Sequence, residues 1–334
     1  MRVARLISVM ERRQIGLYLL AIVAGAVLGW LVPAGSVPLE QAIYPVLGLL
    51  LFATFLGIPF ASIGKAIRDV RFMGTVLVLN FLIVPGVVFT LSRFIAHDQA
   101  LLIGVMMVLL TPCIDYVIVF SGLAGGSSDR LLAAAPLLML TQMLLLPLYL
   151  LFFVGPNLVS GIEPGPFIEA LVFLIVIPLV LAALTQAWAR RAAAGRAVMT
   201  LMEGLMVPLM MLTLAVVIGS QISGVGNEIG SLLSVIPIYA AFLVVMVPLG
   251  MAAARVGGLD AASTKAVIFS GATRNSLVVL PLALALPEPL ALVSLVVVTQ
   301  TSLVELIGMV AYVKIVPWII MTDRPLQLSR IPSP

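Results

Sequence analysis

The feature that most constrains this chain is a series of apolar runs, each about 20 residues long, that recurs from one end of the sequence to the other. A helix of about 20 residues is long enough to cross a hydrocarbon layer of roughly 30 Å. Of the 334 residues, 62% are hydrophobic and only 10% are charged, which is too little charged surface for a soluble protein of this length. The sequence therefore predicts an integral membrane protein.

Each apolar run is expected to be a helix, because backbone groups have no water to bond with in lipid and the runs are too long for barrel strands. The predicted fold class is an all-α polytopic membrane protein with ten transmembrane helices. Residues 1–14 are expected to form an N-terminal arm, and residues 318–334 a tail. The ten predicted spans cover residues 15–33, 39–60, 72–95, 100–123, 130–154, 166–188, 197–220, 229–254, 261–286 and 290–316.

The charges of the loops predict the orientation of the chain. If the N-terminus lies in the cytoplasm, the alternation of ten spans puts all but two of the 18 Lys and Arg residues on the cytoplasmic side. The two exceptions are Arg93, in an external loop, and Arg274, inside a span. We therefore expect a multi-pass protein of the cell (inner) membrane with both termini cytoplasmic. The basic loops also explain the net charge of +4 without nucleic-acid binding.

The longest predicted loop, residues 154–166, divides the ten spans into two sets of five. An odd number of spans per set makes the second set enter the membrane from the opposite face. The sequence thus predicts two inverted repeats, over residues 15–154 and 166–317, an architecture found in many secondary transporters.

Two spans at equivalent places in these repeats are interrupted. The fourth contains Pro112, Cys113 and Asp115 within an apolar run, and the ninth contains the sequence SGATRNS, with Gly271 and Arg274. We expect helix breaks at Pro112 and Gly271. A pair of interrupted spans in corresponding positions indicates a binding site near the middle of the membrane.

Three charged residues are predicted inside spans, where an unpaired charge costs at least roughly 2.5–3.5 kcal/mol. They are Asp115, Arg274 and Glu305, and the last two lie too far from the span ends to reach the headgroups. We expect the guanidinium of Arg274 to pair with Asp115, with Glu305 as the second choice. Cys113 either packs as a small hydrophobic residue or faces a cavity. Four other polar residues either line the site or bond between helices: Thr141, Gln142, Thr299 and Gln300.

Sequence motifs typical of enzymes and of metal or nucleotide sites are missing from the sequence. There is no phosphate loop, no HExxH, no GxSxG and no cysteine pair, and the one histidine lies in a predicted loop. We therefore expect neither an enzyme nor a resident cofactor or metal. The expected partners are a small-molecule or metalloid substrate and the lipid bilayer.

Three motifs carry a resemblance to a known superfamily. PCIDYVIVFSGLAGG resembles the fourth span of the arsenical-resistance-3 permeases, and SGATRNSLVVLPLAL resembles the ninth span of the superfamily that these permeases share with the bile acid:sodium symporters. VELIGMVAY, with Glu305, resembles the tenth span of the arsenite permeases. The resemblance implies that spans four and nine unwind and cross. It also implies that spans one, two, six and seven form a panel domain and the other six a core domain.

The sequence departs from the sodium-coupled relatives at the sodium ligands that the resemblance implies. A Ser-Asn pair after the first break aligns with Val117 and Ile118, and a glutamate of the ninth span aligns with Ser270. The next glutamine aligns with Arg274, so that only Asn275 and Ser276 remain. We therefore expect no sodium coupling. Against the arsenite permeases, Cys113 and Glu305 are kept, whereas a glutamate falls on Leu277 and an asparagine on Arg274.

The sequence thus favours a secondary active transporter that works by alternating access. One hypothesis is arsenite-type efflux, as in arsenical resistance, with the Cys113 thiol near the metalloid and Asp115 or Glu305 carrying a coupled proton. The other is transport of a small organic anion, whose carboxylate binds Arg274 and the N-termini of the half-helices. A membrane receptor or an intramembrane enzyme is a weaker alternative, because the sequence shows no output domain and no nucleophile–base pair.

Overall fold

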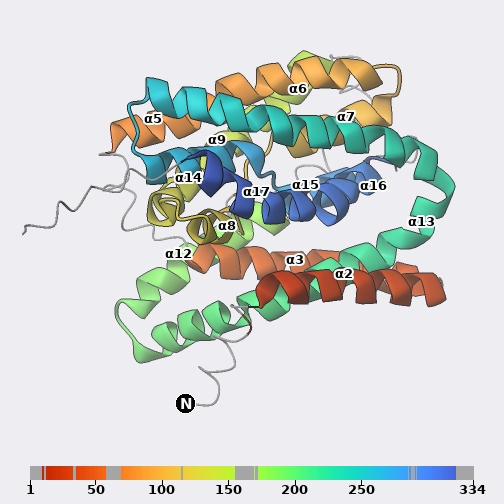
Figure 1. Ribbon diagram of the computed structural model, residues 1–334. Helices are drawn as coiled ribbons and strands as arrows, with labels where there is room; N and C mark the ends of the chain where they lie inside the picture. The colour runs from red at the N-terminus through yellow and green to blue at the C-terminus, as the bar shows by residue number, and fades with distance from the viewer. Residues whose placement is uncertain are drawn as a thin grey trace, which may run out of the picture.

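The computed structural model describes residues 10, 13–32, 35–57, 69–113, 116–154, 169, 172–284, 286, 290 and 292–320. In these residues the chain is helical apart from turns, short connections and one isolated backbone bridge. Helical residues occur in each of the ten predicted spans. The helices, shown in Figure 1, are α2 (Gln14–Leu31), α3 (Ser36–Gly57), α5 (Val70–Val78), η3 (Leu79–Ile83), α6 (Val84–Ser92), η4 (Arg93–Ile95), α7 (Gln99–Leu109), α8 (Tyr116–Leu123), α9 (Ser128–Val154), η5 (Val172–Val176), α12 (Ile177–Ala189), α13 (Ala193–Val256), α14 (Ala261–Ala272), α15 (Ser276–Leu284), α16 (Leu292–Thr299), η7 (Gln300–Glu305) and α17 (Leu306–Ile319).

By length and composition alone, fewer of these helices than the ten predicted spans qualify as membrane spans. Among the described residues, four helical stretches are long and apolar enough to cross a membrane: Val37–Gly57, Val70–Ile95, Ala193–Ile222 and Glu228–Val256. A fifth is the pair Ser128–Gln142 and Leu144–Phe153, which is bent by 48°. The chain is therefore a polytopic membrane protein, as the sequence predicts. Several of the other predicted spans are divided by breaks into shorter helices.

The seventh and eighth predicted spans are not separated by a loop. They are the two halves of α13, a single helix of 64 residues whose ribbon turns back at its middle (Figure 1). The predicted spans at 197–220 and 229–254 correspond to the stretches Ala193–Ile222 and Glu228–Val256, and only the predicted loop between them is replaced by a helical bend. No proline stands in the connecting sequence, so each backbone N–H can still donate within the helix while the chain bends.

The helices form two groups, of which the first comprises α2, α3, α12 and the first half of α13 (Figure 1). The contacts within this group are close. A methyl group added at Gly25 would lie 2.5 Å from the carbonyl oxygen of Ala215, and one added at Gly29 only 2.2 Å from that of Gly219. Glycine is thus required where α2 crosses α13. These are the segments that the resemblance assigns to a panel domain.

The second group comprises α5 to α9, the second half of α13 and α14 to α17. Here Gly250 of α13 lies against α14, since an added methyl group would come within 2.9 Å of the backbone of Ile268. The hydroxyl of Tyr239, also on α13, donates to the carbonyl oxygen of Val296 on α16 at 3.1 Å. The two halves of one helix therefore belong to different groups.

A segment of π-helix, η3, interrupts the third span. The proline that follows it leaves one carbonyl group of this segment without its usual donor. Pro85 has no N–H to donate to the carbonyl oxygen of Phe81, four residues earlier. The hydroxyl of Tyr149 on α9 donates to that oxygen instead, at 2.6 Å. The buried carbonyl group is thereby satisfied, and α9 is fixed against the third span.

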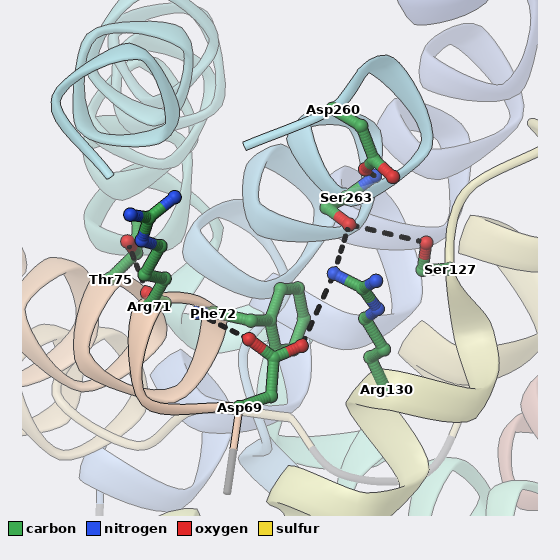
Figure 2. A network of polar contacts seen from close by, with 8 residues as sticks. All are labelled: Asp69, Arg71, Phe72, Thr75, Ser127, Arg130, Asp260 and Ser263. Carbon is green, nitrogen blue, oxygen red and sulfur yellow. Dashed lines mark hydrogen bonds and ion pairs between the residues drawn. The ribbon is translucent and has the colours of Figure 1, made fainter. Parts of the chain in front are cut away.

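Polar contacts hold one end of the second group together (Figure 2). Arg130, at the start of α9, forms a 3.2 Å ion pair with Asp69 and donates to the hydroxyl of Ser263 on α14 at 3.0 Å. Asp69 caps α5 by accepting from the backbone N–H of Phe72, and Asp260 caps α14 by accepting from that of Ser263. The starts of α5, α9 and α14 therefore gather at one end of the molecule.

Candidate functional site

Two spans of the second group are broken near their middles. The fourth span is divided into α7, which ends at Leu109, and α8, which begins at Tyr116. Pro112 lies in this break, as predicted. The ninth span is divided into α14 and α15, and between them Thr273 has an extended backbone, with φ −79° and ψ 137°.

The backbones of the two breaks pair with each other. The N–H of Cys113 donates to the carbonyl oxygen of Thr273 at 3.2 Å, and the N–H of Asn275 donates to that of Thr111 at 2.9 Å. These two bonds make an antiparallel bridge between Pro112 and Arg274. Peptide groups that leave a helix inside a membrane must find other hydrogen-bond partners. Here the peptide groups of each break bond to those of the other break. The two broken helices thus meet at their breaks, as the resemblance implies for spans four and nine.

Gly271 does not form the second break, contrary to our expectation. It lies in the last turn of α14, which continues to Ala272, and the irregular residues are 273–275. A methyl group added at Gly271 would lie 2.7 Å from a side-chain carbon of Leu79 and 2.8 Å from one of Met246. The glycine therefore allows α14 to approach its neighbours closely and does not end the helix.

The side chain of Arg274 is completely buried at this crossing. Its guanidinium donates to the carbonyl oxygens of Leu109 at 3.2 Å and Ser270 at 3.0 Å, and also to that of Gly271. These carbonyl groups belong to the last turns of α7 and α14, where a helix lacks N–H donors and carries the negative end of its dipole. A cation that donates several hydrogen bonds is suited to this place. The ring of Phe242 lies 5.3 Å from the guanidinium carbon and adds a cation–π contact.

Glu305 also contacts Arg274, through the backbone. Its Oε1 accepts from the peptide N–H of Arg274 at 2.7 Å, and the side chain is completely buried. Glu305 is the last residue of the π-segment η7, so the contact joins the tenth span to the break in the ninth. Asp115, the first choice as partner of Arg274, lies outside the described residues, and its pairing with Arg274 stays a prediction.

Asn80 is a residue of the site that our sequence analysis missed. It lies in η3, is completely buried, and its Oδ1 accepts from Nη2 of Arg274 at 2.9 Å. Its Nδ2 donates to the hydroxyl of Ser270 and to the carbonyl oxygen of Val76, both at 3.0 Å. A signal was present, because Asn80 is the one amide in the apolar run VLVLNFLIV. A buried amide needs several partners, and a π-segment often marks a functional position.

The first residues of α15 present polar side chains to the crossing. Oδ1 of Asn275 accepts from the N–H of Val278 at 3.2 Å and caps the helix. Nδ2 of Asn275 and the hydroxyl of Ser276 have no hydrogen-bond partner among the described residues, although both residues are almost fully buried. These groups can donate to a polar ligand at the N-terminus of α15.

The structure places the remaining predicted site residues as follows. Cys113 is buried, with 1% of its surface exposed, in the first break. On α9, Gln142 is buried and Thr141 is partly buried. Thr299 donates to the carbonyl oxygen of Leu295 within its own helix, and Gln300 is buried at the start of η7. No group of three or more His, Cys, Asp or Glu residues able to hold a metal ion occurs in the described parts of the chain.

Broken helices that meet at a buried polar cluster among apolar helices are typical of polytopic membrane transporters. The chain belongs to the Sodium Bile acid symporter family, whose family model matches residues 44–232. The resemblance found in the sequence is thereby confirmed at the level of the superfamily. The match includes Asn80 and the break at Pro112 and ends before the break at Arg274. A search of curated proteins finds no significant match to this chain.

Proposed function

We propose that this protein is a secondary transporter that works by alternating access without sodium coupling. The observation that carries the proposal is the position of the Arg274 guanidinium, which is buried among oxygen atoms of Leu109, Ser270, Gly271 and Asn80 at the crossing. A transporter that couples to sodium must bind and release a cation. A guanidinium stays protonated in proteins and is covalently tethered, so it supplies a positive charge that cannot leave.

Further support for sodium independence comes from the side chains after the first break. Val117 is buried and Ile118 partly buried at the start of α8, and neither carries an oxygen for a hard cation. Ser270 already accepts a hydrogen bond from Asn80. The test is transport in proteoliposomes with sodium replaced by choline or potassium on both sides. We expect unchanged rates with and without sodium, whereas a steep sodium dependence would contradict the proposal.

For the substrate we propose an arsenite-type metalloid, exported from the cell. Support comes from Cys113, whose peptide group takes part in the backbone bridge and whose side chain is buried beside it. Thiol sulfur is a soft ligand that favours soft metal and metalloid centres over hard ones. Glu305 or Asp115 would carry the coupled proton. Everted vesicles that contain the protein should accumulate arsenite when a proton gradient is imposed, and vesicles without the protein should not.

A small organic anion is the second candidate substrate, favoured by the N-terminus of α15. The amide nitrogen of Asn275 and the hydroxyl of Ser276 are donors at this N-terminus, directly after Arg274 in the sequence. Helix N-termini of this kind attract carboxylates. Arsenite and a panel of monocarboxylates should therefore be tested in the same proteoliposomes. Competition of a carboxylate with arsenite would assign both to one site.

The proposed architecture is that of the sequence analysis: ten spans in two inverted repeats, with both termini in the cytoplasm and the panel and core groups moving against each other. Three loops that this topology puts on one face are those before α5, between α8 and α9, and before α14. Beside these loops, Arg130 contacts both Asp69 and Ser263, which supports the assignment. Labelling of single cysteines at Arg130 and Arg93 from either side of sealed vesicles tests it, since the two positions should be reached from opposite sides.

A further inference from the structure

A cavity of about 250 Å³ lies between the two groups of helices, beside the bend of α13. Its walls come from four segments: Ala26 of α2, Ile218 of the first half of α13, Leu232 of the second half, and Leu295 of α16. The residues that line this cavity differ from those at the crossing, since Arg274 and Glu305 do not line it. The cavity is thus a candidate binding site apart from the groups that contact Arg274.

The lining of this cavity is aliphatic. Among the described residues that line it, only Gln221 and Thr299 contribute polar side chains, and none is charged. Both polar side chains already bond within the protein. Oε1 of Gln221 accepts from the hydroxyl of Ser294 at 2.9 Å, and the hydroxyl of Thr299 donates to a carbonyl oxygen of its own helix at 2.8 Å. Water needs two to four polar partners to be stable in such a space, and apolar cavities of this size take apolar ligands instead. Among the described lining residues, only the amide nitrogen of Gln221, which donates to the hydroxyl of Ser220 at 3.5 Å, could also donate to a metalloid or a small carboxylate.

One side of the cavity is continuous with the surface that faces the hydrocarbon of the membrane. Ile229 and Leu233, which line it, are 56% and 57% exposed. On α2, the neighbouring side chains Val23 and Val27 are exposed as well. In a membrane-embedded chain, such large aliphatic side chains contact lipid tails. The ligand that reaches this opening at the highest concentration is therefore an acyl chain.

We propose that this cavity binds one acyl chain of a membrane phospholipid, which enters from the side between α2 and the second half of α13. The chemistry of the walls fits a saturated hydrocarbon along its whole length. Since Ile22 and Ala26 belong to the first group of helices and Leu232 and Leu295 to the second, the bound chain contacts both groups at once. The binding itself depends only on the membrane location of the chain, and not on the substrate or the coupling ion proposed above.

The experiment compares bound lipid in purified variants. Ala26→Trp fills the cavity with a large side chain, and Ile22→Phe fills part of it, which covers the case in which the tryptophan variant does not fold. Val23→Trp places the same bulk on the exposed side of α2 and is the matched control. Each protein is extracted in mild detergent, and the phospholipid that remains bound is measured by mass spectrometry.

We expect about one tightly held phospholipid per wild-type molecule, the same in Val23→Trp, and at least a several-fold lower occupancy in Ala26→Trp and Ile22→Phe. Added phosphatidylglycerol should raise the melting temperature of the wild type and the control by several degrees and that of the filled variants by much less. Equal lipid retention in filled and control variants would overturn the proposal. So would displacement of the lipid by arsenite or a carboxylate, because the cavity would then belong to the substrate path.

Discussion

The side-chain oxygen of Asn80 accepts a hydrogen bond from the guanidinium of Arg274 at 2.9 Å, across 194 positions of sequence. The nitrogen of the same amide donates to the hydroxyl of Ser270, so both the oxygen and the nitrogen of the Asn80 side chain bond to the ninth span. The π-segment of the third span and the break of the ninth therefore hold each other in place. A buried guanidinium that loses one acceptor cannot replace it with water, and this makes Asn80 a sensitive position.

Replacement of Asn80 by leucine tests this relationship. The variant removes an acceptor from a buried cation and a donor from Ser270, and we expect a loss of roughly 1–3 kcal/mol in stability together with loss of transport. Thr90→Val is the control, because Thr90 bonds only to a carbonyl of its own helix and is exposed. Thermal unfolding in nanodiscs measures the effect. An unchanged melting temperature in Asn80→Leu would show that the contact contributes nothing to stability.

Paired substitutions at Arg274 and Asp115 test whether these two residues form the ion pair that the sequence predicts. Arg274→Gln or Asp115→Asn alone should leave one buried charge without its counter-charge and cost roughly 3–5 kcal/mol if the pair is desolvated. The double variant should recover expression but not transport. Yields of folded protein by size-exclusion chromatography give the readout. If the double variant is no better than the worse single one, Glu305 or the carbonyl groups, and not Asp115, balance the arginine.

Cys113→Ser distinguishes the two substrate hypotheses. A hydroxyl is a poor ligand for a soft metalloid, so cells that express the variant should lose arsenite tolerance while protein levels stay the same. Cys113→Ala controls for the hydroxyl that Cys113→Ser places in a buried position, because it removes the thiol without adding a polar group. Full tolerance in both variants would reduce Cys113 to a packing residue and favour the organic anion.

Ser276→Ala examines the organic-anion hypothesis from the other direction. The hydroxyl of Ser276 has no partner among the described residues, so its removal should leave the folded protein as stable as before, to within about 0.5 kcal/mol. If the hydroxyl donates to a carboxylate, KM for that anion should rise roughly tenfold, as expected for the loss of about 1.4 kcal/mol of binding free energy. Arsenite export should be unaffected. A normal KM for every carboxylate tested would argue against this role of the α15 N-terminus.

The polar contacts at the end of the second group predict an acid-sensitive contribution to stability. Hydrogen bonds from the hydroxyl and the backbone N–H of Ser263 lower the pKa of Asp260 below its ordinary value of 3.8. A lowered folded-state pKa means that the stabilisation is present above the unfolded value and is lost as the pH falls through the folded value. The wild type should therefore lose stability below about pH 4 more steeply than Asp260→Asn, which keeps the cap but cannot titrate there. Asp260→Ala should cost about 1 kcal/mol at neutral pH. Equal acid sensitivity of wild type and Asp260→Asn would contradict the assignment.

Much of the fold could be predicted because the bilayer acts as a solvent with strict requirements. Apolar runs of fixed length can only be spanning helices, and a proline or an arginine inside such a run is costly enough to indicate a break or a site. For this reason the membrane class, a break at Pro112 and the need of Arg274 and Glu305 for polar partners could be read from local sequence. The acceptor Asn80 and the carbonyl group of Leu109 could not be read in this way, because they lie on other spans.

Only the tertiary structure decided how these elements meet. The sequence analysis placed a break at Gly271, whereas α14 continues past it, where the glycine allows close packing against Leu79 and Met246. The sequence likewise shows that burying the charge of Arg274 costs free energy, but not which groups surround this side chain. The structure surrounds it with carbonyl groups from the ends of two half-helices, the amide of Asn80 and the ring of Phe242. Local composition fixes which groups must be satisfied, whereas long-range contacts fix which groups satisfy them.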